Sequence, residues 1–163
     1  MTATDKGNLE VVIGEILRDQ QLTLTCAESC TGGLLMHRFT EVPGSSSYFL
    51  GGVVAYNNGV KHALLGVQED VLVEFGAVSE QTAIAMARGV RALLGAHLAL
   101  SITGVAGPGG GTAEKPVGLT YIGLDFRGRV MVQRHVWQGD RSANKHVSAE
   151  AALQMLYDQL QAG

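Results

Sequence analysis

Apolar side chains recur every three or four residues in several segments of the chain, which is the spacing of one face of a helix. In residues 8–20 the apolar positions are Leu9, Val12, Ile13, Ile16 and Leu17. Ser79 and Gly95 frame another such segment as a typical N-cap and a typical C-terminal stop. The pattern predicts helices over residues 8–20, 34–41, 60–65, 79–94 and 142–161.

Other segments have the alternation or the continuous apolar character of strands. Residues 22–25 alternate apolar and polar side chains, and residues 127–129 join two apolar runs as a hairpin turn would. The predicted strands span residues 22–25, 48–56, 97–103, 117–126 and 130–137. Helices interleaved with strands, and a hairpin near the end, predict an α/β fold: a layered single domain over residues 1–163, with a mixed β-sheet flanked by α-helices.

The composition fits one folded domain, because 46% of the 163 residues are hydrophobic and 17% are charged. The formal net charge of −3 argues against a dedicated nucleic-acid-binding protein. No apolar run reaches the length of a membrane span, and residues 1–5 lack the basic start of a signal peptide. We therefore expect a cytoplasmic protein whose partners include no nucleic acid and no membrane.

The two cysteines, Cys26 and Cys30, stand four residues apart, which is not the C-x-x-C spacing of a redox pair. We expect both to be reduced and packed in the interior. No cluster of histidine, cysteine and carboxylate has the spacing of metal ligands. We therefore expect no metal site and no cofactor.

Ser29 is the candidate nucleophile. It lies in the stretch CAESCTGG (residues 26–33), between a predicted strand and a predicted helix. Unpaired N–H groups at a helix start carry partial positive charge, so a serine at such a junction can be exposed beside an oxyanion site. The alternative is that Ser29 or Thr31 only caps the helix.

A serine hydroxyl needs a base to become a good nucleophile. No catalytic setting surrounds any of the five histidines, which are His37, His62, His97, His135 and His146. Lys61, in the stretch YNNGVK (residues 56–61), follows a predicted strand and turn, where a side chain can project into a cleft at the end of the sheet. A desolvated lysine has a lowered pKa and can act as a general base, with Tyr56 to relay or orient the proton. The alternative is a solvated surface lysine.

A glycine-rich loop, GVAGPGGGT (residues 104–112), follows the strand predicted at residues 97–103. So much glycine after a strand lets backbone N–H groups close on an anion such as a phosphate. The loop is not a Walker loop, because no Gly-Lys-Ser/Thr follows it. Lys115, Arg141 and Lys145 are cations that can complete a phosphate site, and the alternative is a flexible glycine linker.

Several motifs together resemble the CinA C-terminal domain family, the nicotinamide-nucleotide amidases. The resemblance covers nearly the whole chain and rests on motifs in the family's order. These are AESCTGG (residues 27–33), GGVVAYNN (51–58) with Lys61, GAVS (76–79), TGVAGPGGGT (103–112), KPVG (115–118) and GDR (139–141).

The resemblance implies an amidohydrolase that deamidates nicotinamide mononucleotide to nicotinate mononucleotide and ammonia, a step of pyridine nucleotide salvage. It implies Ser29 as the nucleophile, with Lys61 and Tyr56 as its activating partners. The expected partner is a small-molecule pyridine nucleotide. The residues expected to bind it are Thr31, Gly32, Gly33, Thr103, Gly104, Gly107, Gly109, Gly110, Gly111, Thr112 and Arg141.

The chain departs from the family pattern at Lys145, where the family commonly has an arginine four residues after the one that matches Arg141. Lysine keeps the charge but lacks the bidentate fork, so the resemblance does not carry an anion contact over to this position. The chain also lacks the larger N-terminal domain of the two-domain CinA proteins, so it looks like the stand-alone amidase form. The resemblance leaves a homo-oligomer open.

Two other functions compete with the amidase. One is a non-catalytic nucleotide-binding module, and the other is a Ser–Lys hydrolase of another amide or of a peptide. The presence of Ser29, Tyr56 and Lys61 together favours catalysis over a binding module. The glycine-rich loop favours a phosphate-bearing substrate over a peptide.

Overall fold

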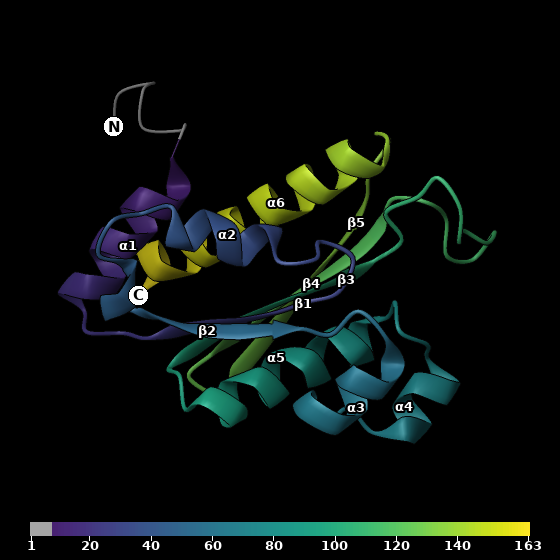
Figure 1. Ribbon diagram of the computed structural model, residues 1–163, viewed down its shortest axis with the longest axis horizontal. Coiled ribbons are helices and arrows are strands. Elements are labelled where there is room, and N and C mark those ends of the chain that lie inside the picture. The colour runs from purple at the N-terminus through teal and green to yellow at the C-terminus, as the bar shows by residue number, and fades with distance from the viewer. Residues whose placement is uncertain (1–7) are drawn as a thin grey trace.

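The computed structural model describes residues 8–163, whose strands form one five-stranded sheet with helices on both faces (Figure 1). The strand order is β2-β1-β3-β4-β5, where β1 is Leu24–Glu28, β2 is Phe49–Val54, β3 is Leu98–Gly104, β4 is Leu119–Phe126 and β5 is Arg129–Val136. β1 is parallel to β2 and to β3, whereas β3–β4 and β4–β5 are antiparallel. The mixed sheet between helices confirms the predicted fold class.

Two layers of helices cover the sheet (Figure 1). One face carries α1 (Leu9–Asp19), α2 (Leu34–Thr40) and α6 (Arg141–Ala162), and the other carries α3 (Asn58–Leu65), α4 (Glu69–Glu74) and α5 (Glu80–Leu94). The first layer encloses a core that includes Leu17, Phe39 and Leu153, and the second encloses a smaller one around Met86 and Val90. β1 and β3 supply residues to both cores, as expected for central parallel strands.

Local sequence signals place several boundaries correctly. The Ser79 hydroxyl accepts the N–H of Thr82 at 3.1 Å and caps α5, and Gly95 ends that helix with a φ of 66°. Arg127 and Gly128 both have positive φ, which is the geometry of a two-residue hairpin turn between antiparallel strands. The predicted cap, stop and hairpin are therefore confirmed.

Other expectations need correction. α4 and the short 3-10 helix Ser45–Ser47 were not predicted; α4 has only six residues, of which Val71 and Leu72 pack against the second core while partly buried, and so short a segment shows no helical period. The strand expected at residues 48–56 ends at Val54. The first strand was predicted to be half-buried over residues 22–25, but all five residues of β1 are buried, because β1 is a central strand with a core on each face. The buried Thr25 hydroxyl donates to the Gly51 carbonyl at 2.7 Å.

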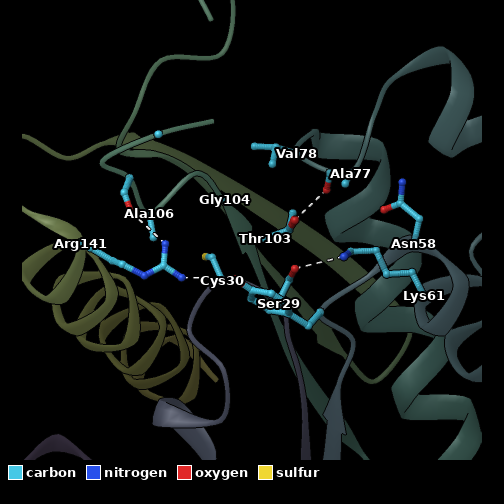
Figure 2. Close-up of a pocket in the computed structure, with 13 residues that line it drawn as sticks. Ser29, Cys30, Asn58, Lys61, Ala77, Val78, Thr103, Gly104, Ala106 and Arg141 are labelled. Carbon is cyan, nitrogen blue, oxygen red and sulfur yellow. Dashed lines mark hydrogen bonds between the residues drawn. The ribbon is translucent and has the colours of Figure 1, made fainter. Parts of the chain in front are cut away.

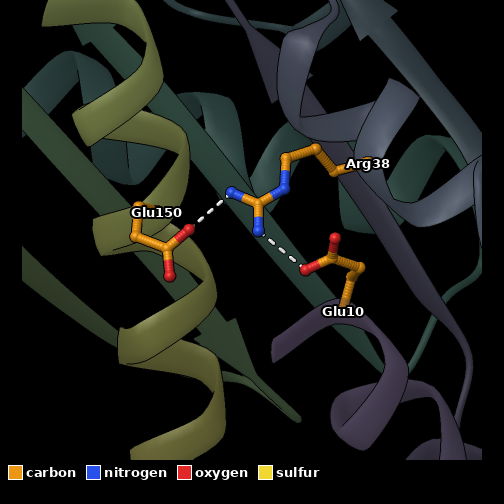
Figure 3. Close-up of polar contacts among 3 residues, drawn as sticks. All are labelled: Glu10, Arg38 and Glu150. Atoms are coloured by element: carbon orange, nitrogen blue, oxygen red, sulfur yellow. Dashed lines mark hydrogen bonds and ion pairs between the residues drawn. The ribbon is translucent and has the colours of Figure 1, made fainter. Parts of the chain in front are cut away.

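An ion-pair cluster ties three helices together (Figure 3). Arg38 of α2 donates to Glu150 of α6 at 2.6 Å and to Glu10 of α1 at 2.7 Å. The Arg38 side chain is only 21% exposed, so solvent screens these contacts less than it screens a surface pair. One guanidinium thus positions α2, the helix that follows Ser29, against α1 and α6.

Gly89 allows α5 to pack closely against α3. A Cβ atom at Gly89 would lie 1.8 Å from the carbonyl oxygen of Leu65, the last residue of α3. Such a distance to a backbone atom leaves no room for a side chain. The close approach sets the position of α3, the helix that carries Lys61.

We expect Gly89→Ala to lower the thermal unfolding midpoint, although alanine favours a helix over glycine by about 1 kcal/mol. The added methyl group forces the backbone of α3 to move. Circular dichroism during heating measures the effect, and Ala92→Gly at an exposed position of α5 is the matched control, with a loss of about 1 kcal/mol from propensity alone. A Gly89→Ala protein as stable as the wild type would contradict the close packing.

Candidate active site

The carboxyl ends of β1 and β3 lie side by side at one edge of the sheet. They lie at the point where the strand order changes direction along the sheet. From β1 the chain crosses to β2 on one side, and from β2 it crosses back to β3 on the other. Crevices at such a point are the usual ligand sites of open α/β sheets. Ser29 follows β1 directly and donates its N–H to the Ile102 carbonyl at 2.9 Å, so it lies beside the end of β3.

Lys61 reaches the Ser29 hydroxyl from α3 (Figure 2). Lys61 Nζ lies 3.0 Å from Ser29 Oγ and donates to the Ala55 carbonyl at 2.8 Å. α3 begins at the turn predicted from the sequence, because the Asn57 side chain accepts the N–H of Val60 at 2.9 Å. The structure therefore brings together the predicted nucleophile and the predicted base, which are 32 residues apart in the chain.

Lys61 is buried without a counter-ion. Only 1% of its surface is exposed, and within residues 8–163 no carboxylate lies within 4.0 Å of its amine. Burial lowers the pKa of Lys61, because the charged ammonium loses its hydration. A neutral amine that donates one hydrogen to Ala55 has its lone pair free to accept the proton of Ser29, as a general base requires. The surface-lysine alternative is wrong.

Ser29 and Lys61 line an open cavity of about 300 Å³ (Figure 2). Ser29 is 8% exposed, so its hydroxyl is less accessible than a strand-to-helix junction predicts. The other predicted site residues on the wall are Tyr56, Thr103, Gly104, Gly107, Gly109 and Arg141. Five further wall residues were not assigned to the site from the sequence, and these are Cys30, Asn58, Ala77, Val78 and Ala106. All five lie inside the motifs that carry the resemblance, and this was the signal in the sequence that could have assigned them to the site.

Arg141 joins two sides of the cavity. Its guanidinium donates to the Gly107 carbonyl at 2.8 Å and to the Tyr56 hydroxyl at 3.2 Å. The Tyr56 side chain is 62% exposed, and among the hydrogen bonds of residues 8–163 none links it to Ser29 or Lys61. Tyr56 thus stands at the rim beside Arg141, and its role as a proton relay stays a prediction.

The glycine-rich loop meets the cavity with only part of its length. Gly107 and Gly109 line the wall, whereas Gly110, Gly111 and Thr112 are not among the lining residues. The Thr112 hydroxyl instead accepts the N–H of Lys115 at 2.9 Å within the loop. Lys115 also donates its amine to the Phe75 carbonyl, so the loop is anchored to the segment that carries Ala77 and Val78 rather than being a free linker.

The turn after Ser29 corrects two expectations. Neither Ser29 nor Thr31 caps α2, because the N-cap is Gly33 and the Thr31 hydroxyl is buried without a hydrogen-bond partner. The start of α2 is not open to an external anion either, since Glu28 occupies it by accepting the N–H groups of Leu35 and Met36. Thr31, Gly32 and Gly33, which were expected to bind substrate, do not line the cavity.

Both cysteines are free and buried. In the part of the chain that the structure describes, no three histidine, cysteine, aspartate or glutamate side chains are grouped as a metal site would require. No helix formed by residues 8–163 combines the length and the apolar character needed to cross a membrane.

A model of the CinA C-terminal domain family matches residues 6–160. The chain belongs to the CinA C-terminal domain family. Solved CinA structures share its fold: competence/damage inducible protein CihA of Agrobacterium tumefaciens is 40% identical with a TM-score of 0.92 over 96% of both chains. A CinA superfamily protein of Klebsiella pneumoniae is 31% identical, with a TM-score of 0.93 over 97% of this chain and 99% of that one.

Curated CinA relatives are longer than this chain. A protein of Moorella thermoacetica named as competence-damage inducible is 55% identical over 159 residues, which is 98% of this chain and 38% of that protein. A CinA-like protein of Geotalea uraniireducens is 44% identical over 97% of this chain and 38% of its own length. The chain therefore spans a little over a third of the length of these relatives.

Burial of Lys61 also predicts how the stability of this CinA domain depends on pH. The folded chain binds the Lys61 proton less tightly than the unfolded chain does, so lowering the pH below about 10.4 favours unfolding. We expect the wild type to lose stability relative to Lys61→Met by at most about 1.4 kcal/mol per pH unit, until the pH reaches the lowered pKa of folded Lys61. Urea unfolding of both proteins from about pH 10 downwards measures this difference. A difference that does not change with pH would show that Lys61 is not desolvated.

Proposed function

We propose that this CinA domain is an amidohydrolase that converts nicotinamide mononucleotide to nicotinate mononucleotide and ammonia. The observation that carries the proposal is the 3.0 Å contact between the buried Lys61 amine and the Ser29 hydroxyl in the wall of an open cavity. The pair has the geometry of a serine nucleophile with its base. The resemblance of its motifs to those of the nicotinamide-nucleotide amidases supports the choice of substrate.

The first half of the proposed reaction forms an acyl-enzyme. Ser29 Oγ attacks the carboxamide carbon while Lys61 Nζ takes the hydroxyl proton. The N–H of Cys30, which lines the cavity and which no carbonyl within residues 8–163 accepts, is the donor that we assign to the developing oxyanion. The carbon–nitrogen bond then breaks, Lys61 returns the proton to the leaving nitrogen, and ammonia departs.

The second half releases the product. A water molecule takes the place of ammonia, and Lys61 removes one of its protons as the oxygen attacks the Ser29 ester. The ester bond breaks, the proton passes from Lys61 to Ser29 Oγ, and the released carboxylic acid gives its own proton to solvent to become the nicotinate carboxylate. Both halves use the same lysine and require no group beyond water.

Charges around the cavity support a substrate that carries a phosphate. Arg141 lies on the wall, and its guanidinium is held in place by Gly107 and Tyr56. Lys145 lies one helical turn later and borders, together with Arg141, a neighbouring hollow rather than the cavity itself. We place the carboxamide of the mononucleotide at Ser29 and its phosphate near Arg141, because both residues line the same cavity.

We expect Ser29→Ala to lose roughly a thousandfold or more of the turnover of nicotinamide mononucleotide while the fold is kept, because the covalent nucleophile is removed. Enzymatic detection of released ammonia measures turnover. Ser46→Ala, at an exposed serine away from the cavity, is the matched control. Nicotinamide, its riboside and asparagine should be poor substrates, and near wild-type turnover by Ser29→Ala would remove Ser29 from the mechanism.

The second expectation for this reaction concerns Lys61. Because the base must be neutral, kcat/KM of the wild type should rise with pH as Lys61 loses its proton. Lys61→Arg should be inactive although it keeps the charge, since arginine does not give up its proton at working pH. Initial rates across the pH range measure both effects. If Lys61→Arg kept most of the activity, the base would have to be another group, with Tyr56 the next candidate.

A further inference from the structure

Glu28, the residue before the nucleophile, has a carboxylate that the proposed reaction does not use. Its side chain is fully buried at the end of β1. One carboxylate oxygen accepts the N–H of Leu35 at 3.0 Å, and the other accepts the N–H of Met36 at 2.9 Å. In the chain from residue 8 onward, no lysine, arginine or histidine nitrogen forms an ion pair with it. Only the start of α2 therefore balances its charge.

The two hydrogen bonds replace a cap that α2 cannot carry itself. The N-cap position is Gly33, whose φ of 106° disfavours the serine or aspartate that usually caps a helix. Leu35 and Met36 are the second and third residues of α2, and theirs are the N–H groups that a cap normally satisfies. The cap therefore has to come from elsewhere in the chain, and Glu28 supplies it.

The same contact closes the turn that carries Ser29. Glu28 precedes the turn, and its two hydrogen-bond donors follow the turn, so residues 29–33 are fixed at both ends. Within the turn, the N–H of Gly32 bonds to the Ser29 carbonyl at 3.1 Å. A hydrogen bond to a carboxylate is about twice as strong as one between neutral groups, so this closure is firm.

We propose that Glu28 is a positioning residue that holds the turn of residues 29–33 in the shape that presents the Ser29 hydroxyl to Lys61. Glu28 is not among the residues that line the cavity, and its carboxylate oxygens are hydrogen-bonded to α2. Its effect on turnover rests on the proposed function, whereas its effect on the reactivity of position 29 does not. The two are tested separately.

The kinetic test uses Glu28→Gln, which keeps the shape but turns one acceptor into a donor facing an N–H group. We expect kcat for nicotinamide mononucleotide to fall about a hundredfold, with KM changed less than about threefold. Glu10→Gln is the matched control, because it weakens the Arg38 cluster that also holds α2 but lies outside the cavity wall. It should lower the unfolding midpoint without changing kcat. A folded Glu28→Gln protein with wild-type kcat would overturn the proposal.

The second test needs no substrate. In a Ser29→Cys background, the introduced thiol is alkylated with iodoacetamide, and peptide mass spectrometry separates it from the buried Cys26 and Cys30. We expect Glu28→Gln to slow alkylation at position 29 by about tenfold or more. Equal rates would overturn the proposal. A slowed rate together with a wild type that does not act on nicotinamide mononucleotide would support the role of Glu28 and overturn the proposed function alone.

Glu28→Asp provides the variant to use if Glu28→Gln does not fold. It keeps the negative charge but is one methylene shorter, so it cannot reach both N–H groups of α2. We expect the same tenfold or greater loss of alkylation at position 29, because position rather than charge is what Glu28 supplies. Wild-type alkylation in Glu28→Asp would overturn the proposal.

Discussion

The parallel pairing of β1 with β3 is the constraint on which the site depends. Glu28, the last residue of β1, is paired with Ile102, two residues before the end of β3, so the chain leaves both strands at the same edge of the sheet. Ser29 then follows one strand, and the glycine-rich loop follows the other. Because β2 lies on the opposite side of β1, the chain after β2 returns over the second face and delivers α3 with Lys61 to the same edge. The cavity is a consequence of this strand order.

Burial lowers the pKa of Lys61 and also makes this side chain costly for the stability of the fold. An amine without a counter-ion destabilises the interior when it is charged, and the surrounding packing has to tolerate it. The close approach of α5 at Gly89 and the two hydrogen bonds of the amine hold Lys61 in place. This arrangement resembles the general pattern in which catalytic sites lower the stability of the fold that carries them.

Apolar periodicity is a local signal, and it predicted the layered fold. The strand-then-turn setting made Ser29 and Lys61 candidates, and the resemblance of the motifs to the family paired them. The sequence did not predict α4, since six residues are too few to show a helical period. It did not predict the contacts of Glu28 either, because its partners depend on how α2 folds back over β1. Thr112 was expected at the phosphate because its loop is rich in glycine. That contact stays a prediction. The Thr112 hydroxyl also accepts the N–H of Lys115 within the loop, which composition alone does not reveal.

Cys30 stands next to Ser29 on the same cavity wall, yet it is not a competing nucleophile. Burial, with a contribution from the charge of Glu28, raises the pKa of the Cys30 thiol to about 11. Peroxides attack the thiolate far more readily than the thiol, so a sulfur in this state resists oxidation to sulfenic acid. If Ser29 is the nucleophile, as we propose, the site keeps it under oxidative stress that inactivates cysteine-dependent enzymes, although a cysteine lies beside it.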